Sequence, residues 1–437
     1  MQRLLSSLFL CLALPVGAQE FTTYKGHGGP VMGLVVTDDG TLASASFDNS
    51  VGLWDGVEPL WLEGHDAAVT TVEPFQPGIL LSGGDDFALW LWEGNTGHLL
   101  GKHKGKIQDI ATAMAPDGPT IATASWDGSI GVWNVGKVDD DGSWTAVRRD
   151  LLGHDAGVNA VAFSEDGTRI YSASSDGTVR VWATDGVPRV LASNGFAVNE
   201  IVVNEPQGWL AYGAVDGVTR VIDVETGEQI ADFTLDRRPI LSMEHHVPTG
   251  QLAIGDGEGH IMMVDTNEWR ITRDFRAMRQ GPVWALAFST DGTVIHAGGI
   301  DDVIYAWPVA LLDTYDPAGG DTRSFLRDAE TMSNGERQFM RKCSICHSLE
   351  NGPSRKAGPT LHGVFGRKAG VVPGYRYSPT LDGSDIVWDD TTIDALFDEG
   401  PDHYIPGSKM PMQVIAAPQD RADLIAYLRT ATKEERQ

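Results

Sequence analysis

Two cysteines and the residue that follows them are the most reactive group in this sequence. The chain has three cysteines. Cys11 falls in an apolar N-terminal stretch that we expect to be removed, which leaves Cys343 and Cys346. Two thiols three residues apart can form a disulfide, bind a metal ion or attach covalently to a cofactor. A zinc site needs a second pair of ligands, and the rest of the sequence offers none at a suitable spacing.

His347 favours covalent attachment, because it completes the motif Cys-Ser-Ile-Cys-His. In this motif both thiols can add to the two vinyl groups of a haem from one helical turn, and the histidine becomes an axial ligand of the iron. A thioredoxin-like redox pair would need a βαβ setting and would leave His347 unexplained. The sequence therefore predicts one haem c, attached through Cys343 and Cys346.

The segment around the motif resembles a class I cytochrome c from about Asn334 to Thr432, which is nearly all of that fold. The resemblance is carried, in the family's order, by the stretches SNGERQFMRKCSICH, AGPTLHGVFGRKAG, PGYRYSPTL, IVW, YIPGSKMP and RADLIAYLR. It implies a small all-α domain that transfers electrons. Gly335 on its first helix should let the last helix approach closely at the position of Leu424 and Tyr427.

A methionine is the expected sixth ligand of the iron. Met410 lies in the stretch YIPGSKMP, and a thioether opposite an imidazole favours ferrous iron and raises the reduction potential. Met412, His362 and His403 are the alternatives. The resemblance favours Met410, because the family's ligand directly follows the lysine of this stretch. Ser408, from the same loop, is assigned to the environment of the haem.

Four other residues are also assigned to this environment. The carbonyl of Pro359 can accept a hydrogen bond from the second ring nitrogen of His347, which would fix the tautomer of the ligand. The resemblance implies that Arg367, Tyr377 and Trp388 hydrogen-bond a buried haem propionate. The two aromatic residues are also compatible with core packing.

The sequence departs from the family in two places. Leu396 or Phe397 occupies the position of a tyrosine near the methionine, so a hydrogen bond to the methionine sulfur should be missing. The ring of lysines around the exposed haem edge is also thin: Lys342, Lys356 and Lys409 remain, whereas other ring positions hold Asp402, His403, Ala416 and Ala417. Docking to the acidic partners that are usual for the family is therefore only weakly supported.

Residues 19–311 are dominated by an internal repeat. An acidic residue marks one equivalent turn at intervals of 38 to 49 residues. In the first four repeats a tryptophan follows this residue by six positions, and a serine or threonine precedes it by four. The acidic residues are Asp48, Asp86, Asp127, Asp176, Asp216, Glu258 and Asp301. The pattern resembles the WD40 repeat, which implies an all-β propeller with seven blades.

The repeats also predict how the ring closes. The segment from Phe21 to Tyr24 precedes the first repeat and should supply the outer strand of the last blade, so that no sheet edge is left exposed. We interpret His27, His65, His103 and His154 as structural residues rather than metal ligands, because each recurs at the same position of its repeat.

Two other places in the propeller could bind a ligand. His245 and His246 lie near Arg237 and Arg238 in the degenerate fifth and sixth repeats, although repeats often decay without gaining a function. The run from Asp139 to Asp141 suggests calcium, but the ligand spacing of a calcium loop is absent.

The N-terminus has the pattern of a signal peptide. Arg3 precedes an apolar stretch from Leu4 to Gly17, and Val16 and Ala18 are placed as the small residues of a cleavage site. We therefore expect residues 1–18 to be cleaved and the mature protein to be periplasmic. No later stretch approaches the roughly 20 apolar residues that a transmembrane helix needs.

Charge separates the two predicted domains. The chain carries a net charge of -27, which disfavours nucleic acid or an anionic lipid surface as its partner. From residue 325 onward 14 basic residues face 16 acidic ones, so about -25 belongs to the preceding residues. We assign residues 312–326 to a linker that few contacts need to cross, and residues 327–437 to the cytochrome domain.

Three functions are compatible with this organisation. We favour an electron carrier that is not an enzyme and whose acidic propeller docks a redox protein, possibly a basic one, with an apolar contact at the exposed haem edge near Met412 and Ala416. The alternatives are a redox enzyme with a substrate site on the propeller and an assembly or scaffold factor for a respiratory complex. The enzyme would need a second cofactor, for which the propeller sequence offers no convincing ligand set.

Overall fold

The computed structural model describes residues 22–56, 58–116, 118–137, 143–183, 186–234, 239–278, 280–312, 332–352, 354–410 and 413–433. The predicted signal peptide, residues 313–326 of the predicted linker, Asp139–Asp141, Arg237, Arg238 and Met412 lie outside these residues. Among the described residues, no helix is both long and apolar enough to cross a membrane.

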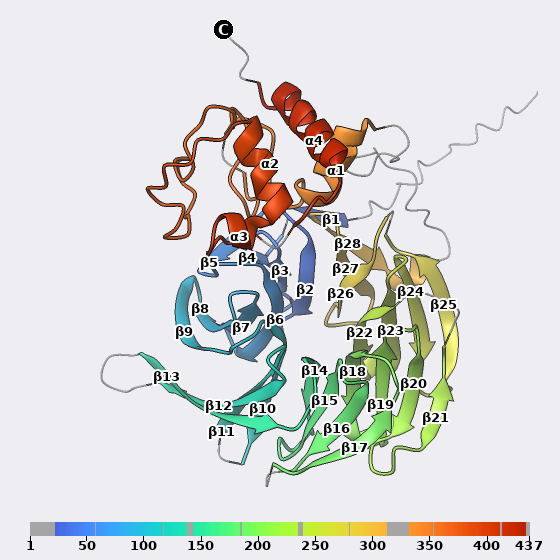
Figure 1. Ribbon diagram of the computed structural model, residues 1–437. Coiled ribbons are helices and arrows are strands. Elements are labelled where there is room, and N and C mark those ends of the chain that lie inside the picture. The colour runs from blue at the N-terminus through green and yellow to red at the C-terminus, as the bar shows by residue number, and fades with distance from the viewer. Residues whose placement is uncertain are drawn as a thin grey trace, which may run out of the picture.

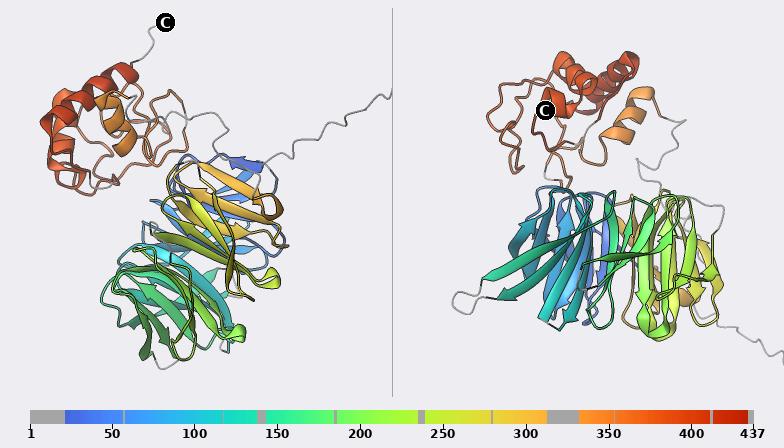
Figure 2. Two further views of the ribbon diagram at one scale, coloured as in Figure 1. Left: turned by 90° about the vertical axis from the view of Figure 1, so that its right-hand side faces the viewer. Right: turned by 60° about the horizontal axis from the view of Figure 1, so that its bottom comes forward.

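The N-terminal part is a ring of seven four-stranded antiparallel sheets (Figures 1 and 2). The first three blades contain β2 Val31–Val36, β3 Leu42–Ser46, β4 Ser50–Trp54, β5 Pro59–Glu63, β6 Val69–Gln76, β7 Ile79–Gly84, β8 Ala88–Glu93, β9 Thr96–Lys102, β10 Ile107–Ala115, β11 Gly118–Ser125, β12 Ser129–Lys137 and β13 Trp144–Leu152. The next two contain β14 Val158–Phe163, β15 Ile170–Ser174, β16 Thr178–Trp182, β17 Pro188–Ser193, β18 Val198–Asn204, β19 Trp209–Ala214, β20 Thr219–Asp223 and β21 Gln229–Asp232. The last two contain β22 Ile240–His246, β23 Gln251–Asp256, β24 His260–Asp265, β25 Arg270–Arg276, β26 Val283–Phe288, β27 Val294–Gly299, β28 Val303–Pro308 and β1 Thr22–Lys25. The predicted seven-bladed propeller is confirmed.

The seventh blade is closed by the N-terminal strand, as the sequence predicted. Strand β1 pairs antiparallel with β28, and Thr22 lies opposite Ala306. The last blade is thus built from both ends of the propeller, and the innermost strands β2 and β26 of blades one and seven are in contact. Pairing β1 with β28 covers an edge that would otherwise expose unpaired backbone groups.

Each of the first four blades contains a buried chain of hydrogen bonds. In blade one, His27 Nε2 lies 2.7 Å from Ser44 Oγ, which also accepts a bond of 2.8 Å from Trp54 Nε1. The other ring nitrogen of His27 lies 2.9 Å from an Asp48 carboxylate oxygen. The same chain recurs in His65–Ser82–Asp86–Trp92, His103–Thr123–Asp127–Trp133 and His154–Ser172–Asp176–Trp182. The structural interpretation of these histidines is confirmed.

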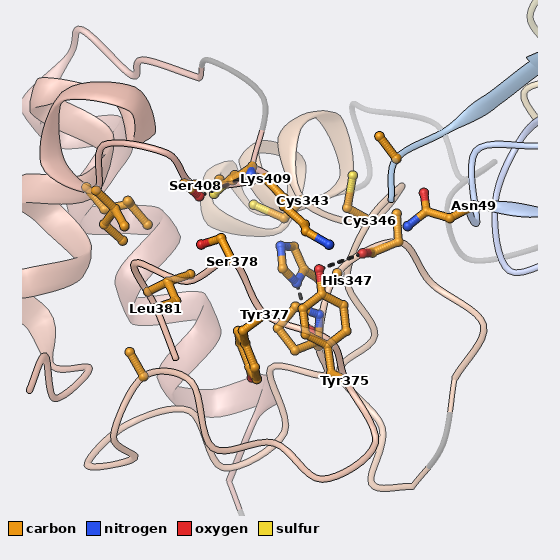
Figure 3. Close-up of a pocket in the computed structure, with 18 of the residues that line it drawn as sticks. Asn49, Cys343, Cys346, His347, Tyr375, Tyr377, Ser378, Leu381, Ser408 and Lys409 are labelled. Atoms are coloured by element: carbon orange, nitrogen blue, oxygen red, sulfur yellow. Dashed lines mark hydrogen bonds between the residues drawn. The ribbon is translucent and has the colours of Figure 1, made fainter. Parts of the chain in front are cut away.

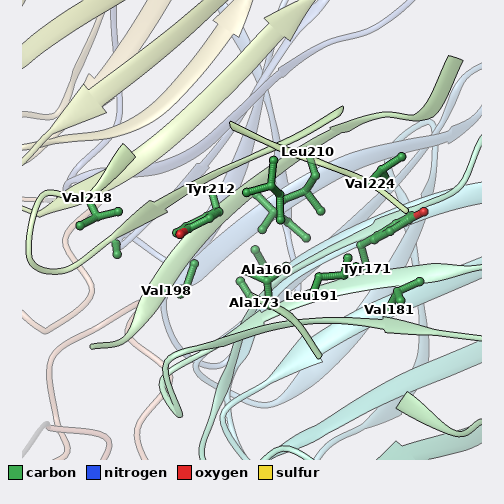
Figure 4. Packing of buried hydrophobic residues seen from close by; sticks show 14 residues of the cluster. Ala160, Tyr171, Ala173, Val181, Leu191, Val198, Leu210, Tyr212, Val218 and Val224 are labelled. Carbon is green, nitrogen blue, oxygen red and sulfur yellow. The ribbon is translucent and has the colours of Figure 1, made fainter. Parts of the chain in front are cut away.

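Apolar side chains fill the space between neighbouring blades. Figure 4 shows one such cluster, in which Tyr171 of blade four packs near Leu210 and Tyr212 of blade five. All three are almost fully buried. Strands in the middle of a blade, such as β3 and β19, are therefore buried along their whole length, whereas the outermost strands β9, β13, β21 and β25 stay largely exposed.

Carboxylates from four blades line the centre of the ring. Glu73, Asp109, Glu200 and Glu244 come from the innermost strands β6, β10, β18 and β22 and border one cavity. Burial raises the pKa of Glu244 to about 8 and that of Asp109 to about 6. Burial also raises the pKa values of Glu73 and Glu200 well above the usual range. The folded propeller therefore binds protons that the unfolded chain releases near pH 4.

We expect Glu244→Gln to stabilise the propeller at pH 8 more than at pH 5. The raised pKa of Glu244 gives a stabilising contribution that is complete below the unfolded pKa and is lost as the pH rises through about 8. Glutamine stays neutral at both pH values. The melting temperature of Glu244→Gln should therefore fall less from pH 5 to pH 8 than that of the wild-type protein. Glu228→Gln, at an exposed position, is the matched control. An identical fall in all three proteins would contradict the prediction.

The C-terminal part is a small helical domain, as predicted. It contains α1 Asn334–Lys342, α2 Asp390–Glu399, α3 Pro401–Tyr404 and α4 Pro418–Ala431. The amide of Glu336 donates to the Ser333 hydroxyl at the start of α1, and α2 begins with a reciprocal pair between Asp389 and Thr392. These bonds satisfy helix N–H groups that have no partner within the helix.

Helices α1 and α4 cross in close contact. A Cβ atom at Gly335 would overlap the carbonyl oxygen of Asp423, so this crossing requires glycine. The rings of Phe339 and Tyr427 lie 5.7 Å apart beside it. This confirms the predicted role of Gly335. The buried Arg421 ties α2 to α4 through ion pairs of 2.8 Å to Asp394 and Asp398.

The helical domain lies on one face of the propeller, over the first blades (Figures 1 and 2). In Figure 2 the strands of the ring run roughly perpendicular to this face, so the loops between them point towards the helical domain. Many of the propeller residues nearest to this domain therefore belong to turns, and Trp61 and Glu63 of β5 also contact it.

Candidate haem site

The attachment motif forms one tight turn at the end of α1. Cys343 caps the helix, and its amide donates to the carbonyl of Phe339 at 2.8 Å. The amide of His347 donates to the carbonyl of Cys343, also at 2.8 Å. Both thiols and the imidazole therefore lie along one turn of chain and border the same cavity (Figure 3).

His347 is held in one tautomer. Its Nδ1 lies 2.7 Å from the carbonyl oxygen of Pro359. Because a carbonyl only accepts hydrogen bonds, Nδ1 carries the proton and the lone pair of Nε2 is free to bind a metal. Burial lowers the pKa of His347, which favours the neutral form that a metal needs. Gly358 leaves room for the ring, since a Cβ atom there would lie 2.5 Å from His347 Cε1.

The thiols are kept protonated by their surroundings. Burial raises the pKa of Cys343 to about 12 and that of Cys346 to about 11. Thiols in this state are weak nucleophiles and weak ligands for free metal ions. Their geometry places them at one side of the cavity, where both can be bonded by a single flat cofactor.

Met410 borders the same cavity from the loop that follows α3. The hydroxyl of Ser408 accepts a hydrogen bond of 3.1 Å from the amide of Met410, which fixes the backbone at this point. Ser408 therefore acts by positioning the methionine. Leu396 and Phe397, the two residues considered for the missing tyrosine, both line the cavity and present apolar side chains there.

Arg367, Tyr377 and Trp388 also line the cavity. The guanidinium of Arg367 donates to the carbonyls of His362 and Thr360 at 2.6 and 2.7 Å. These bonds orient the group, and since a guanidinium has five N–H donors, others are left for an acidic ligand group.

All nine site residues predicted from the sequence thus border one cavity of about 700 Å³. Pockets that enclose small organic ligands measure about 300 to 1,000 Å³. The alternative ligands His362 and His403 are not among the residues that line it, and His403 is exposed. Met412 lies outside the described residues.

The donor set fits a covalently held haem. Two thiols, an imidazole with a free Nε2 and a thioether converge on a mostly apolar space, and the Ser378 hydroxyl is buried there without a hydrogen-bond partner among the described residues. Sequence reasoning missed Ser378, as well as Tyr375, whose hydroxyl donates to the carbonyl of Ala357 at 2.9 Å. Both lie in the stretch PGYRYSPTL, but nothing in their spacing indicates which side chains point inward.

The propeller contributes to the same cavity, which the sequence did not predict. Phe47, Asn49, Phe87 and Trp126 line it together with the helical domain. Figure 3 shows Asn49, from the propeller, beside Cys346. The open side of the cavity therefore faces the propeller.

Basic side chains of the helical domain contact acidic ones of the propeller. Arg355 lies 3.0 Å from Glu63, Lys409 lies 3.2 Å from Asp66, and Arg376 also pairs with Asp66. The expectation that few contacts join the two domains was wrong. It failed because the sequence positions of basic and acidic residues do not show which of them will pair between two domains.

The other suggested ligand sites gain no support. His246 bonds to the Thr249 hydroxyl at 2.8 Å and to the Thr290 carbonyl at 3.2 Å, whereas the His245 ring packs edge-on against Trp209. In the part of the chain that the structure describes, no group of three or more His, Cys, Asp or Glu side chains could hold a metal ion.

Comparisons with known families match both domains. Residues 332–432 match the family described as "Cytochrome c". Residues 18–55, 94–134, 145–183 and 270–308 match the repeat described as "WD domain, G-beta repeat". The fold and its two parts thus agree with the resemblances found in the sequence.

Individual relatives cover the C-terminal domain. The chain is 44% identical over 102 residues to cytochrome c of Sesamum indicum, which is 23% of this chain and 90% of that protein. It is 41% identical over 116 residues to cytochrome c of Gibberella zeae, or 26% of this chain and 99% of that protein. The fold of the propeller is similar to the crystal structure of the WD40 β-propeller domain of Doa1, with a TM-score of 0.55 and 20% identity over 65% of this chain and 94% of that one.

Proposed function

Because the chain belongs to the cytochrome c family through its C-terminal domain, we propose that it is a periplasmic electron carrier whose propeller docks a redox protein. The domain carries a covalently attached haem c, and this group supplies one-electron chemistry when bound. The protein residues hold the haem, orient its ligands and exclude water from it. In this proposal the chain passes electrons on and converts no substrate of its own.

The observation that best supports the proposal is the convergence of donors in one cavity. Cys343, Cys346, His347 and Met410 all border it, and the carbonyl of Pro359 orients the imidazole. A thioether opposite an imidazole raises the reduction potential of the iron. His347 and Met410 would both hold the iron of the haem, and such a ligand pair would suit reversible electron exchange.

Charge supports the choice of a basic redox partner. About -25 of the net charge belongs to residues 1–324, so the propeller has a strong negative potential. Three basic groups of the haem domain, Arg355, Arg376 and Lys409, already face propeller carboxylates and are less available to an acidic partner. The signal peptide predicted from the N-terminal sequence supports the periplasm as the compartment in which the two proteins meet.

We expect the reaction with a small basic redox protein to slow steeply as salt is added. Association between opposite charges is accelerated by long-range attraction, which is screened over about 8 Å at physiological ionic strength. Stopped-flow absorbance of the haem across ionic strengths measures the rate for the full-length protein. An acidic redox protein of similar potential is the control, and its rate should rise with salt. Equal salt dependence for both would contradict the proposal.

A further inference from the structure

We propose that the turns of blades one to three form the outer wall of the haem cavity, so that the protein's own propeller covers its open side. This inference rests on the covalent haem of the C-terminal domain and is independent of any redox partner. Its starting point is the single cavity that Cys346 and Met410 share with Phe47, Phe87 and Trp126 of the propeller.

Phe87 occupies a position that glycine holds in other blades. We call the acidic residue that marks the equivalent turn of each repeat the turn acid. The residue after it is Gly128, Gly177, Gly217 or Gly259 in blades three to six, with φ between 81 and 89°. In blade two this residue is Phe87, with φ of 68°. A phenylalanine rarely adopts this left-handed conformation. A strained backbone conformation of this kind is kept where the side chain has a task. The side chain of Phe87 borders the haem cavity.

The residue before the turn acid is aromatic in two of the three blades that border the cavity, and in blade two it is Asp85, which also lines the cavity. Phe47 and Trp126 hold this position in blades one and three and line the cavity. The blades that do not border the cavity have Ser175, Val215, Gly257 and Ile300 there. Aromatic side chains thus form the apolar part of the propeller wall, beside the charged side chains of Asp66, Asp85 and Lys106.

The contact between the two domains is specific as well as charged. The guanidinium of Arg355 lies 3.9 Å above the ring of Trp61 and is also paired with Glu63. The amide of Gly28 donates to Asp48, and a Cβ atom at Gly28 would overlap the main chain of Arg355. The haem domain can therefore sit in this place only because residue 28 has no side chain.

Blades two to four carry larger side chains at the position of Gly28, whereas blade five has Gly195 there. Asp66, Lys104 and Asp155 hold it in blades two to four, and the amide of each donates to the turn acid of its blade as Gly28 does. A side chain is therefore compatible with the blade and incompatible only with the docked haem domain. The docked haem domain therefore requires glycine at position 28, whereas the turn of the blade does not.

Covering the cavity changes the redox properties of the haem. An apolar wall in place of water disfavours the more highly charged ferric state and so raises the reduction potential. It also limits the approach of small reagents. Electrons that reach the haem from the propeller side then pass through these turns or along their edge.

Two variants of the full-length holoprotein test the wall. Gly28→Lys introduces the side chain that blade three tolerates and should separate the domains. Phe87→Gly introduces the residue of the other blades, which removes the ring and relieves the backbone. In both, we expect the midpoint potential to fall by the equivalent of up to about a tenfold change in the ferrous-to-ferric ratio, or 59 mV for one electron. Oxidation of the ferrous protein by a neutral benzoquinone should become several-fold faster.

Asp155→Lys is the matched control, because it places lysine at the same turn of blade four, away from the haem. It should keep the wild-type potential and rate. Small-angle scattering of the full-length protein reports whether Gly28→Lys has separated the two domains. If the domains stay together, the potential and the oxidation rate of Phe87→Gly test the proposal. Wild-type potentials and rates in both test variants would overturn the proposal, and so would an equal shift in Asp155→Lys.

Discussion

Replacing Met410 with alanine should lower the reduction potential by on the order of 0.2 V, since the choice of axial ligand spans about 0.8 V among haem proteins. Met410 borders the haem cavity, and the loop that carries it is fixed through the Ser408 hydroxyl. Loss of the thioether removes the ligand that favours ferrous iron. The weak red absorption band of methionine-bound ferric haem should disappear at the same time. Redox titration followed by visible absorbance measures both effects.

Met412→Ala is the control for this prediction, because Met412 is the nearest alternative ligand in the sequence. It should leave the band and the potential almost unchanged. The opposite result, with a large effect for Met412→Ala and a small one for Met410→Ala, would reverse the ligand assignment.

Substituting Gly335 by valine should destabilise the haem domain by about 3 kcal/mol or more, which is the upper range for overpacking a closely packed contact. The new side chain would collide with the carbonyl of Asp423 and with Tyr427, and the backbone of α4 cannot move without disturbing the core behind it. Because α1 ends at Cys343, its displacement should also reduce the yield of attached haem. Thermal unfolding followed at the haem absorbance, together with the haem content per chain, measures the two effects.

Ala426→Val provides the comparison on the same pair of helices. Ala426 is an exposed residue of α4, so valine there costs only the small difference in helix propensity. Similar melting temperatures for Gly335→Val and the wild-type protein would show that the crossing of α1 and α4 can loosen without cost, in contrast to the packing described above.

Electron exchange with a partner involves the face where the haem domain meets the propeller. The sequence placed the contact of a partner at an exposed haem edge near Met412 and Ala416. That contact stays a prediction, and in the structure the haem cavity also borders the turns of the propeller. A partner attracted by the acidic propeller would thus arrive beside the haem domain, which makes the rim around Asp66 and Trp126 the first place to test by mutation.

Local sequence was sufficient for the features that depend on neighbouring residues. The motif ending at His347 predicts covalent haem because its three reactive groups fall on one turn of chain, whatever the rest of the fold does. The seven blades could be counted because an acidic residue marks the same turn in every repeat, and the first four repeats add a buried chain of His, Ser or Thr, Asp and Trp, as in His27 to Trp54.

Only the tertiary structure decided what surrounds the haem. Arg355 and Glu63 are 292 positions apart, and Lys409 and Asp66 are 343 apart, so no periodicity or motif connects them. Their pairing depends on shape and charge matching between two separately folded domains. Phe87 takes the place that glycine holds in blades three to six, but only the tertiary structure shows that this residue borders the haem cavity, because the cavity forms where two separately folded domains meet.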